Sequence, residues 1–252
     1  MLLTDDDPAV FSLVRPAGAS PYLLAVDHAG RALPRRLGDL GVSAAALATH
    51  IASDLGIAEV ARRVAQHLDA WLILQNYSRL VIDVNRPPGT PQSILTLSER
   101  TRVPGNEQLS QVDAASRERE IFAPYHARIR QELDRRAAAE RPTALCALHS
   151  FTPSFLGEAR PWHVGVLYNR DPRLGRALLA GLRRDPALVV GDNEPYAVSD
   201  ETDFTVVTHA ERRGIPYVEI EIRQDPIADD AGQARWAQRL TGLLQEAYAS
   251  AP

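Results

Sequence analysis

The chain has 252 residues, of which 45% are apolar and 24% charged, a balance typical of a globular protein with a substantial core. Its formal net charge of -4 provides no overall electrostatic attraction for nucleic acid. The basic residues are all Arg, and the absence of Lys excludes both a Walker-type phosphate loop and catalysis by a Lys base or Schiff base.

The first half of the chain alternates strand-like runs with helical spacing. In chain order we predict a strand, two helices and two further strands: 22–26, 43–50, 56–68, 71–74 and 79–84. The polar stretch 87–111 that follows contains four prolines, and we interpret it as an ordered excursion or lid rather than a domain linker.

The second half begins with a long, charged amphipathic helix and then continues the alternation. Helices are predicted over 113–139, 173–183, 204–212 and 229–248, and strands over 145–148, 164–168, 188–190 and 217–222. Strands that alternate with helices favour a single α/β domain over residues 1–252, with a mixed, largely parallel sheet flanked by helices.

Compartment signals point to the cytoplasm. Cys146 is the one cysteine and lies in an apolar run, so we expect a buried thiol and no internal disulfide. The acidic N-terminus does not resemble a secretion signal, and no window approaches the roughly 20 apolar residues of a membrane-spanning helix. We expect neither a membrane nor a nucleic acid as partner.

Polar side chains follow several of the predicted strands. His28 comes just after the first strand, Asn85 and Arg86 follow 79–84, and His149 stands at the end of the strand 145–148. Functional groups of α/β sheets gather in loops past the carboxyl ends of strands, so this placement is the first indication of a site.

Two of these residues, His28 and His149, are candidate metal ligands. A neutral imidazole in such a loop can bind zinc while its other nitrogen is held by a backbone or carboxylate acceptor. Taken alone, each is more simply a hydrogen-bonded structural histidine. A third ligand is needed, and Asp54 is our choice, although its position also suits a helix N-cap. Asp27 is the alternative ligand, or a residue that orients a neighbouring ligand.

Five segments with a recognisable pattern occur in order along the chain: Val26-Asp-His-Ala-Gly30, Tyr77-Ser-Arg-Leu-Val-Ile-Asp-Val-Asn-Arg-Pro87, Leu148-His-Ser-Phe-Thr-Pro153, Gly191-Asp-Asn-Glu-Pro-Tyr196 and Glu219-Ile-Glu-Ile-Arg-Gln-Asp225. Together they resemble the N-formylglutamate amidohydrolase family, in its predicted-amidohydrolase branch. The resemblance runs from about residue 20 to residue 245. It implies an amide hydrolase with one Zn²⁺ ion that acts on a small acidic N-acyl amino acid such as N-formylglutamate.

A more distant similarity links the chain to zinc carboxypeptidases and implies a fold of that type. Asp83-Val-Asn-Arg86 resembles their substrate-binding Asn-Arg pair, His149-Ser-Phe resembles a segment with a zinc ligand, and Glu221-Ile-Arg223 resembles the segment with the catalytic glutamate. His28-Ala-Gly-Arg31 lacks the Glu of their His-x-x-Glu motif, so the second ligand must come from elsewhere.

These resemblances imply a role for each candidate residue. Glu221 would act as general base, and Arg79 with the metal would stabilise the oxyanion. The implied substrate-binding residues are Asn85, Arg86, Asn193, Tyr196 and His163. Arg86 would bind the substrate's α-carboxylate through its planar fork, helped by Asn85.

Each role has a plainer alternative. Glu219 and Glu221 alternate with apolar residues, as on a half-solvated strand, and Arg79 with Asp83 suits a simple salt bridge. His126 lies in a charged helical segment and is expected at the surface. The alternative functions are a zinc carboxypeptidase or cell-wall amidase acting on a peptide, or an inactive binding protein of the same fold.

Overall fold

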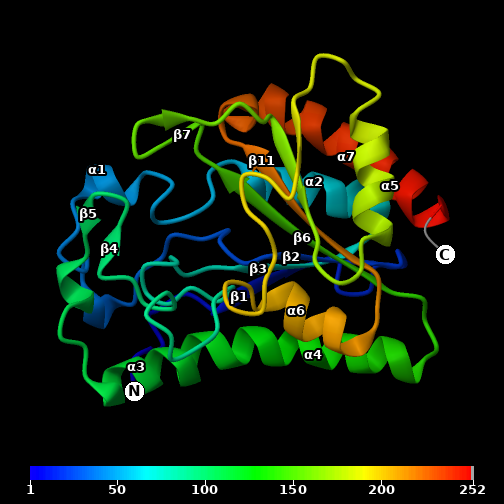
Figure 1. Cartoon of the computed structure of the whole chain (residues 1–252). Helices are drawn as coiled ribbons and strands as arrows, with labels where there is room; N and C mark the ends of the chain where they lie inside the picture. The colour runs from blue at the N-terminus through cyan, green and yellow to red at the C-terminus, as the bar shows by residue number, and fades with distance from the viewer. Residues whose placement is uncertain (251–252) are drawn as a thin grey trace.

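A mixed sheet forms the middle layer of the protein in the computed structural model, which describes residues 1–250 (Figure 1). Within these residues the sheet has seven strands in the order β1-β3-β2-β6-β11-β9-β10. Their bounds are β1 Phe11–Val14, β2 Tyr22–Val26, β3 Trp71–Gln75, β6 Ala144–Phe151, β9 Val164–Leu167, β10 Val190–Asp192 and β11 Tyr217–Arg223.

Most neighbouring strands of the sheet are parallel. β2 pairs in parallel with β3 and β6, β6 with β11, and β9 with β10, whereas β1 against β3 and β9 against β11 are antiparallel. β2, β3 and β6 are buried along their whole length, as expected for strands that are covered on both faces. The predicted α/β fold with a mixed, largely parallel sheet is confirmed.

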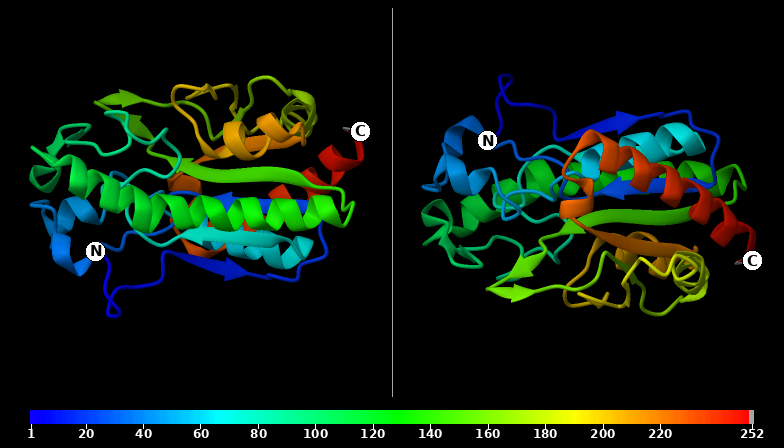
Figure 2. Two further views of the ribbon diagram at one scale, coloured as in Figure 1. Left: turned by 90° about the horizontal axis from the view of Figure 1, so that it is seen from below. Right: turned by 90° about the horizontal axis from the view of Figure 1, so that it is seen from above.

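Helices cover both faces of the sheet. The main ones are α2 Ile57–Leu68, α4 Ala123–Ala138, α5 Arg173–Leu182, α6 Thr205–His209 and α7 Asp230–Ser250. α2, α5 and α7 pack on one face, and α4 and α6 lie on the other, where Figure 2 shows α4 running lengthwise along the strands. Within the described residues, no helix combines the length and apolar character that crossing a bilayer requires.

The N-terminus of α2 shows whether Asp54 acts as a helix cap. Its N-cap is Gly56, whose φ of 79° lies in the left-handed region that favours glycine. A Cβ there would collide with the carbonyl oxygen of Ile227. Asp54 therefore does not cap the helix, and the N-cap interpretation of this residue is wrong.

Residues 79–84, which we predicted as a strand, form a buried loop instead. The run is apolar because Leu80, Val81 and Ile82 pack against the helices, not because it joins the sheet. Its carbonyls are satisfied by side chains, since Asn106 donates to Leu80 O and Arg117 donates to Val81 O, both at 2.8 Å.

Other differences are smaller. The predicted helix 113–139 is observed as α3 Gln111–Arg117, a π-helical turn Glu118–Phe122 and α4. His126 in α4 is buried rather than solvated, because it hydrogen-bonds His209 and the carbonyl of Val84. β6 continues past His149 to Phe151, and β1 was not predicted.

The short elements lie at the carboxyl-terminal edge of the parallel strands. The excursion 87–111 contains the hairpin β4 Leu97–Ser98 and β5 Thr101–Arg102, and a second hairpin consists of β7 Ser154–Phe155 and β8 Glu158–Ala159. α1 Ala44–Leu47 lies on the same side as β4 and β5 (Figure 1).

Candidate metal centre and its pocket

Three segments bring His28, Asp54 and His149 together. His28 lies two residues past β2, and His149 lies in the last part of β6. Because β2 and β6 are parallel neighbours, their carboxyl ends meet at one edge of the sheet. Asp54 comes from the loop before α2, and its backbone N–H donates to His28 O at 2.9 Å.

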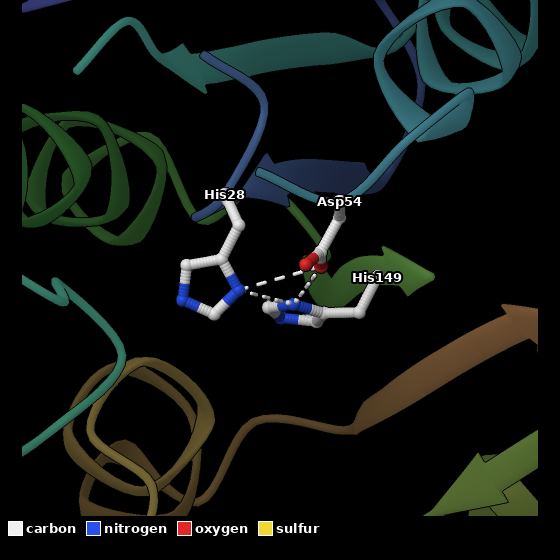
Figure 3. A group of neighbouring side chains, drawn as sticks. All are labelled: His28, Asp54 and His149. Carbon is white, nitrogen blue, oxygen red and sulfur yellow. Dashed lines mark hydrogen bonds and ion pairs between the residues drawn. The ribbon is translucent and has the colours of Figure 1, made fainter. Parts of the chain in front are cut away.

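The three side chains point toward a common centre (Figure 3). His28 Nδ1 and His149 Nδ1 are 3.2 Å apart, and Asp54 Oδ2 lies 3.3 Å from the former and 3.0 Å from the latter. Tetrahedral zinc with bonds of about 2.0–2.1 Å requires neighbouring ligand atoms roughly 3.3 Å apart. The observed triangle therefore fits three corners of such a site.

The far side of each imidazole faces a carboxylate. His28 Nε2 lies 2.7 Å from Asp83 Oδ1, and His149 Nε2 lies 3.3 Å from Asp27 Oδ2. These carboxylates favour a proton on Nε2, which leaves the Nδ1 lone pairs free to meet at the centre. Two lone pairs at 3.2 Å repel each other unless a cation lies between them, so the donor set fits a divalent metal.

The two carboxylates behind the histidines are themselves held in place. Asp27 Oδ1 accepts hydrogen bonds from Tyr125 Oη at 2.8 Å and Thr205 Oγ1 at 2.9 Å. Burial alone would raise the pKa of Asp83, but the Arg79 guanidinium, 2.6 Å away, and His28 hold that pKa well below its usual range. Arg79 also lies 3.5 Å from Asp54, so it couples the ligand carboxylate to the one behind His28.

Glu219 and Glu221 lie on one face of β11 beside His149, and both are buried. Their Oε2 atoms have no hydrogen-bond partner. Burial raises the pKa of Glu221 to about 7, and it raises the pKa of Glu219 well above its usual range. The half-solvated strand that the alternation suggested is therefore not present.

These groups line a cavity of about 550 Å³, within the size range of small-molecule sites. The predicted site residues that line it are His28, Asp54, Arg79, Asn85, Arg86, His149, Tyr196 and Glu221. Sequence reasoning did not give a role to the further lining residues Glu219 and Asp203. For Glu219 a signal existed, since its spacing of two from Glu221 places both on one face.

Asn85 and Arg86 are engaged by the segment that follows Thr202. Asn85 Oδ1 accepts from the backbone N–H groups of Phe204 and Thr205, so this side chain caps the start of α6. Arg86 donates to Thr202 O and lies 3.5 Å from Asp203. Arg86 is the one with donors left for a ligand, whereas the Asn85 amide holds the loop that carries the pocket wall.

His163 and Asn193 do not line this pocket. The His163 ring accepts from Val189 N–H at 2.9 Å, which ties together the strands β9 and β10. Asn193, with φ of 52°, accepts from Tyr168 N–H through Oδ1 and stabilises the turn after β10. Both residues therefore stabilise the β9–β10 end of the sheet.

Comparisons with known proteins bear on the family and the fold. A family model described as N-formylglutamate amidohydrolase matches residues 20–228. A solved gene product of Agrobacterium tumefaciens is 35% identical, with a TM-score of 0.96 over 99% of both chains. The solved N-formylglutamate amidohydrolase of Ralstonia eutropha JMP134 is 19% identical, with a TM-score of 0.67 over 96% of this chain and 98% of that one. A search of the curated proteins finds no match.

Proposed function

The chain belongs to the N-formylglutamate amidohydrolase family, and from this premise we propose that it hydrolyses the amide bond of a small N-acyl amino acid. The first-choice substrate is N-formylglutamate, which would yield formate and glutamate. One Zn²⁺ ion, held by His28, Asp54 and His149, is the proposed cofactor. The observation that supports this proposal most directly is the triangle of two Nδ1 atoms and one carboxylate oxygen, with sides of 3.0 to 3.3 Å.

When bound, such an ion supplies Lewis-acid chemistry that acidifies water and polarises an amide carbonyl. Glu221 faces the same space, with an unpartnered carboxylate oxygen and a pKa that burial raises to about 7. A base of that pKa accepts a proton from the attacking water and returns it to the departing amine. The Arg79 guanidinium lines the same pocket and stabilises negative charge on the former carbonyl oxygen.

Arg86 is the proposed partner of the substrate's α-carboxylate. Its side chain lines the pocket and is a quarter exposed, so part of its fork can reach a ligand. The α6 cap formed by Asn85 keeps Thr202 and Asp203 against Arg86 and so fixes its position. Tyr196 closes the same pocket from the loop after β10.

The shape of the pocket favours a small substrate over a peptide. The excursion 87–111 contributes Leu95, Leu97 and Glu99 to its wall. This excursion touches the β7–β8 hairpin, because Arg100 donates to Leu156 O at 3.1 Å and Leu156 N–H donates to Glu99 at 3.4 Å. We propose that it acts as an ordered lid, and a groove for an extended peptide would need this contact broken.

The test combines metal content with turnover. Purified protein should contain about one equivalent of zinc, lose turnover of N-formyl-L-glutamate on chelation, and regain it when zinc is added. Glu221→Gln should abolish turnover but retain the metal, whereas His149→Ala should lose both. Protein that binds no divalent metal, and in which added zinc restores no hydrolysis of N-formyl or N-acetyl amino acids, would refute the proposal.

A further inference from the structure

Arg160 packs on the aromatic wall of the pocket, and its guanidinium has no acidic partner within the described residues. Arg79 faces Asp83 and Asp54, and Arg86 faces Asp203. No carboxylate in residues 1–250 lies within 4.0 Å of the Arg160 guanidinium. Its charge is therefore left for a ligand, whereas those of the other two arginines are already shared with carboxylates.

Three aromatic rings surround this guanidinium, and all three line the pocket. Arg160 Cζ lies 4.7 Å from the ring centre of Phe155, 4.9 Å from Tyr196 and 5.8 Å from Phe151. Rings that contact the flat faces of an arginine leave the N–H groups at its edge accessible, and those of Arg160 that do not donate to Tyr196 fit a carboxylate. The rings thus fix the orientation of the cation without neutralising it.

The backbone around Arg160 is also fixed. Arg160 N–H donates to Pro153 O at 2.9 Å across the β7–β8 hairpin, and Arg223 donates to Arg160 O at 3.2 Å from the end of β11. A guanidinium on such a tied segment loses less freedom when it binds a ligand than one on a mobile loop does.

Tyr196 connects Arg160 to the catalytic side of the pocket. Arg160 Nη1 donates to the Tyr196 hydroxyl at 2.7 Å. Tyr196 and Glu221 line the same pocket, and desolvation together with the charge of Glu221 raises the pKa of Tyr196. A ligand that reaches Arg160 can therefore also occupy the space before Glu221.

The charge of the proposed substrate explains why a cation without an acidic partner is needed in this pocket. A pocket lined by the acidic side chains of Asp54, Glu99 and Asp203 repels a second substrate carboxylate unless an unpaired cation meets it. Building on the proposed function, we propose that Arg160 binds the side-chain carboxylate of an acidic N-acyl amino acid and so determines specificity, while Arg86 binds the α-carboxylate.

The test compares N-formyl-L-glutamate with its neutral isostere N-formyl-L-glutamine, on zinc-loaded protein. For wild type and Arg160→Gln, both turnover and calorimetric binding are measured. The variant should lose about 10- to 100-fold in kcat/KM for the glutamate substrate, the range for a lost charge-assisted contact, and change less than about threefold for the glutamine substrate. For the glutamate substrate, the kcat/KM of Arg160→Lys, which keeps the charge but not the planar fork, should lie between those of wild type and Arg160→Gln.

Arg100→Gln is the matched control, because Arg100 belongs to the neighbouring excursion 87–111 and donates to a backbone carbonyl of the same β7–β8 hairpin. It should leave the preference for glutamate over glutamine unchanged. Three outcomes would each overturn the role of Arg160. The first is an equal loss of kcat/KM on both substrates in Arg160→Gln, and the second is a wild type that shows no preference in turnover and binding. The third is a loss of the preference in Arg100→Gln instead of Arg160→Gln. If turnover is absent but wild type binds the glutamate ligand more tightly and Arg160→Gln does not, the binding role stands and the hydrolase proposal fails.

Discussion

Replacing Glu221 with Gln tests whether its carboxyl is buried and protonated in the metal-free protein, independently of catalysis. Burial raises the pKa of Glu221 from 4.5 to about 7, so between these values the folded protein binds a proton that the unfolded chain has lost. Stability from this group is then fully present below pH 4.5 and is lost as pH rises through 7. A shift of that size corresponds to about 3 kcal/mol.

Gln resembles the protonated carboxyl but does not ionise. With chelator present, the free energy of unfolding of Glu221→Gln should therefore be nearly that of wild type at pH 5. At pH 8 it should exceed the wild-type value by up to about 3 kcal/mol. Urea unfolding followed by tryptophan fluorescence at both pH values measures the difference. All other titrating groups are common to the two proteins, so most of their pH dependence cancels in the comparison.

Glu158→Gln is the control, because Glu158 is exposed on β8 and its replacement should leave the pH dependence unchanged. Adding zinc should shrink the advantage of Glu221→Gln at pH 8, because a nearby cation favours the ionised carboxylate of the wild type. An advantage that is the same at pH 5 and pH 8, or a variant less stable than wild type at pH 8, would show that Glu221 is not a desolvated titrating group.

Three further predictions concern the metal, the pH profile and the backbone. Asp83→Asn should weaken zinc affinity about 10- to 100-fold in a chelator competition, because Asp83 orients His28, and unchanged affinity would contradict that role. With zinc in excess, kcat/KM should rise with pH until Glu221 is ionised, below or near pH 7, and a profile falling over that range would exclude Glu221 as base. Gly56→Ala should cost about 1–3 kcal/mol in urea unfolding, because of its positive φ and the contact with Ile227, whereas the same change at Gly242, where nothing crowds a Cβ, should cost less.

The fold was predictable where the chain alternates buried strands with amphipathic helices. The resemblance in five segments is confirmed by the family model, and the layered sheet follows from runs such as residues 22–26 and 217–222. The loop 79–84 was not predictable in the same way, because an apolar run buried by helices has the same composition as a buried strand. Only the positions of Asn106 and Arg117, distant in sequence, show how its carbonyls are satisfied.

Part of the candidate site could also be predicted from the sequence, and part depends on the tertiary structure. His28 and His149 were predicted as ligands because strands end beside them, and Asp54 was chosen as the third ligand; the structure brings the three side chains together. The carboxylate behind each histidine depends on tertiary geometry: Asp83 reaches His28 from a loop, and Asp27 turns away from its neighbour His28 to reach His149. Adjacent residues that point in opposite directions can thus serve opposite sides of one candidate metal centre.

Arg160 gave no sequence signal, because an arginine beside a hairpin is ordinary in a chain whose basic residues are all Arg. Its importance comes from what surrounds it: aromatic rings instead of the carboxylates that face Arg79 and Arg86. Those two arginines fix the acidic groups of the site, and an arginine that is already neutralised contributes less to attracting an anion. A substrate with two negative charges therefore needs a cation that the fold leaves unpaired, and the order of the acidic residues along the chain does not show which arginine that is.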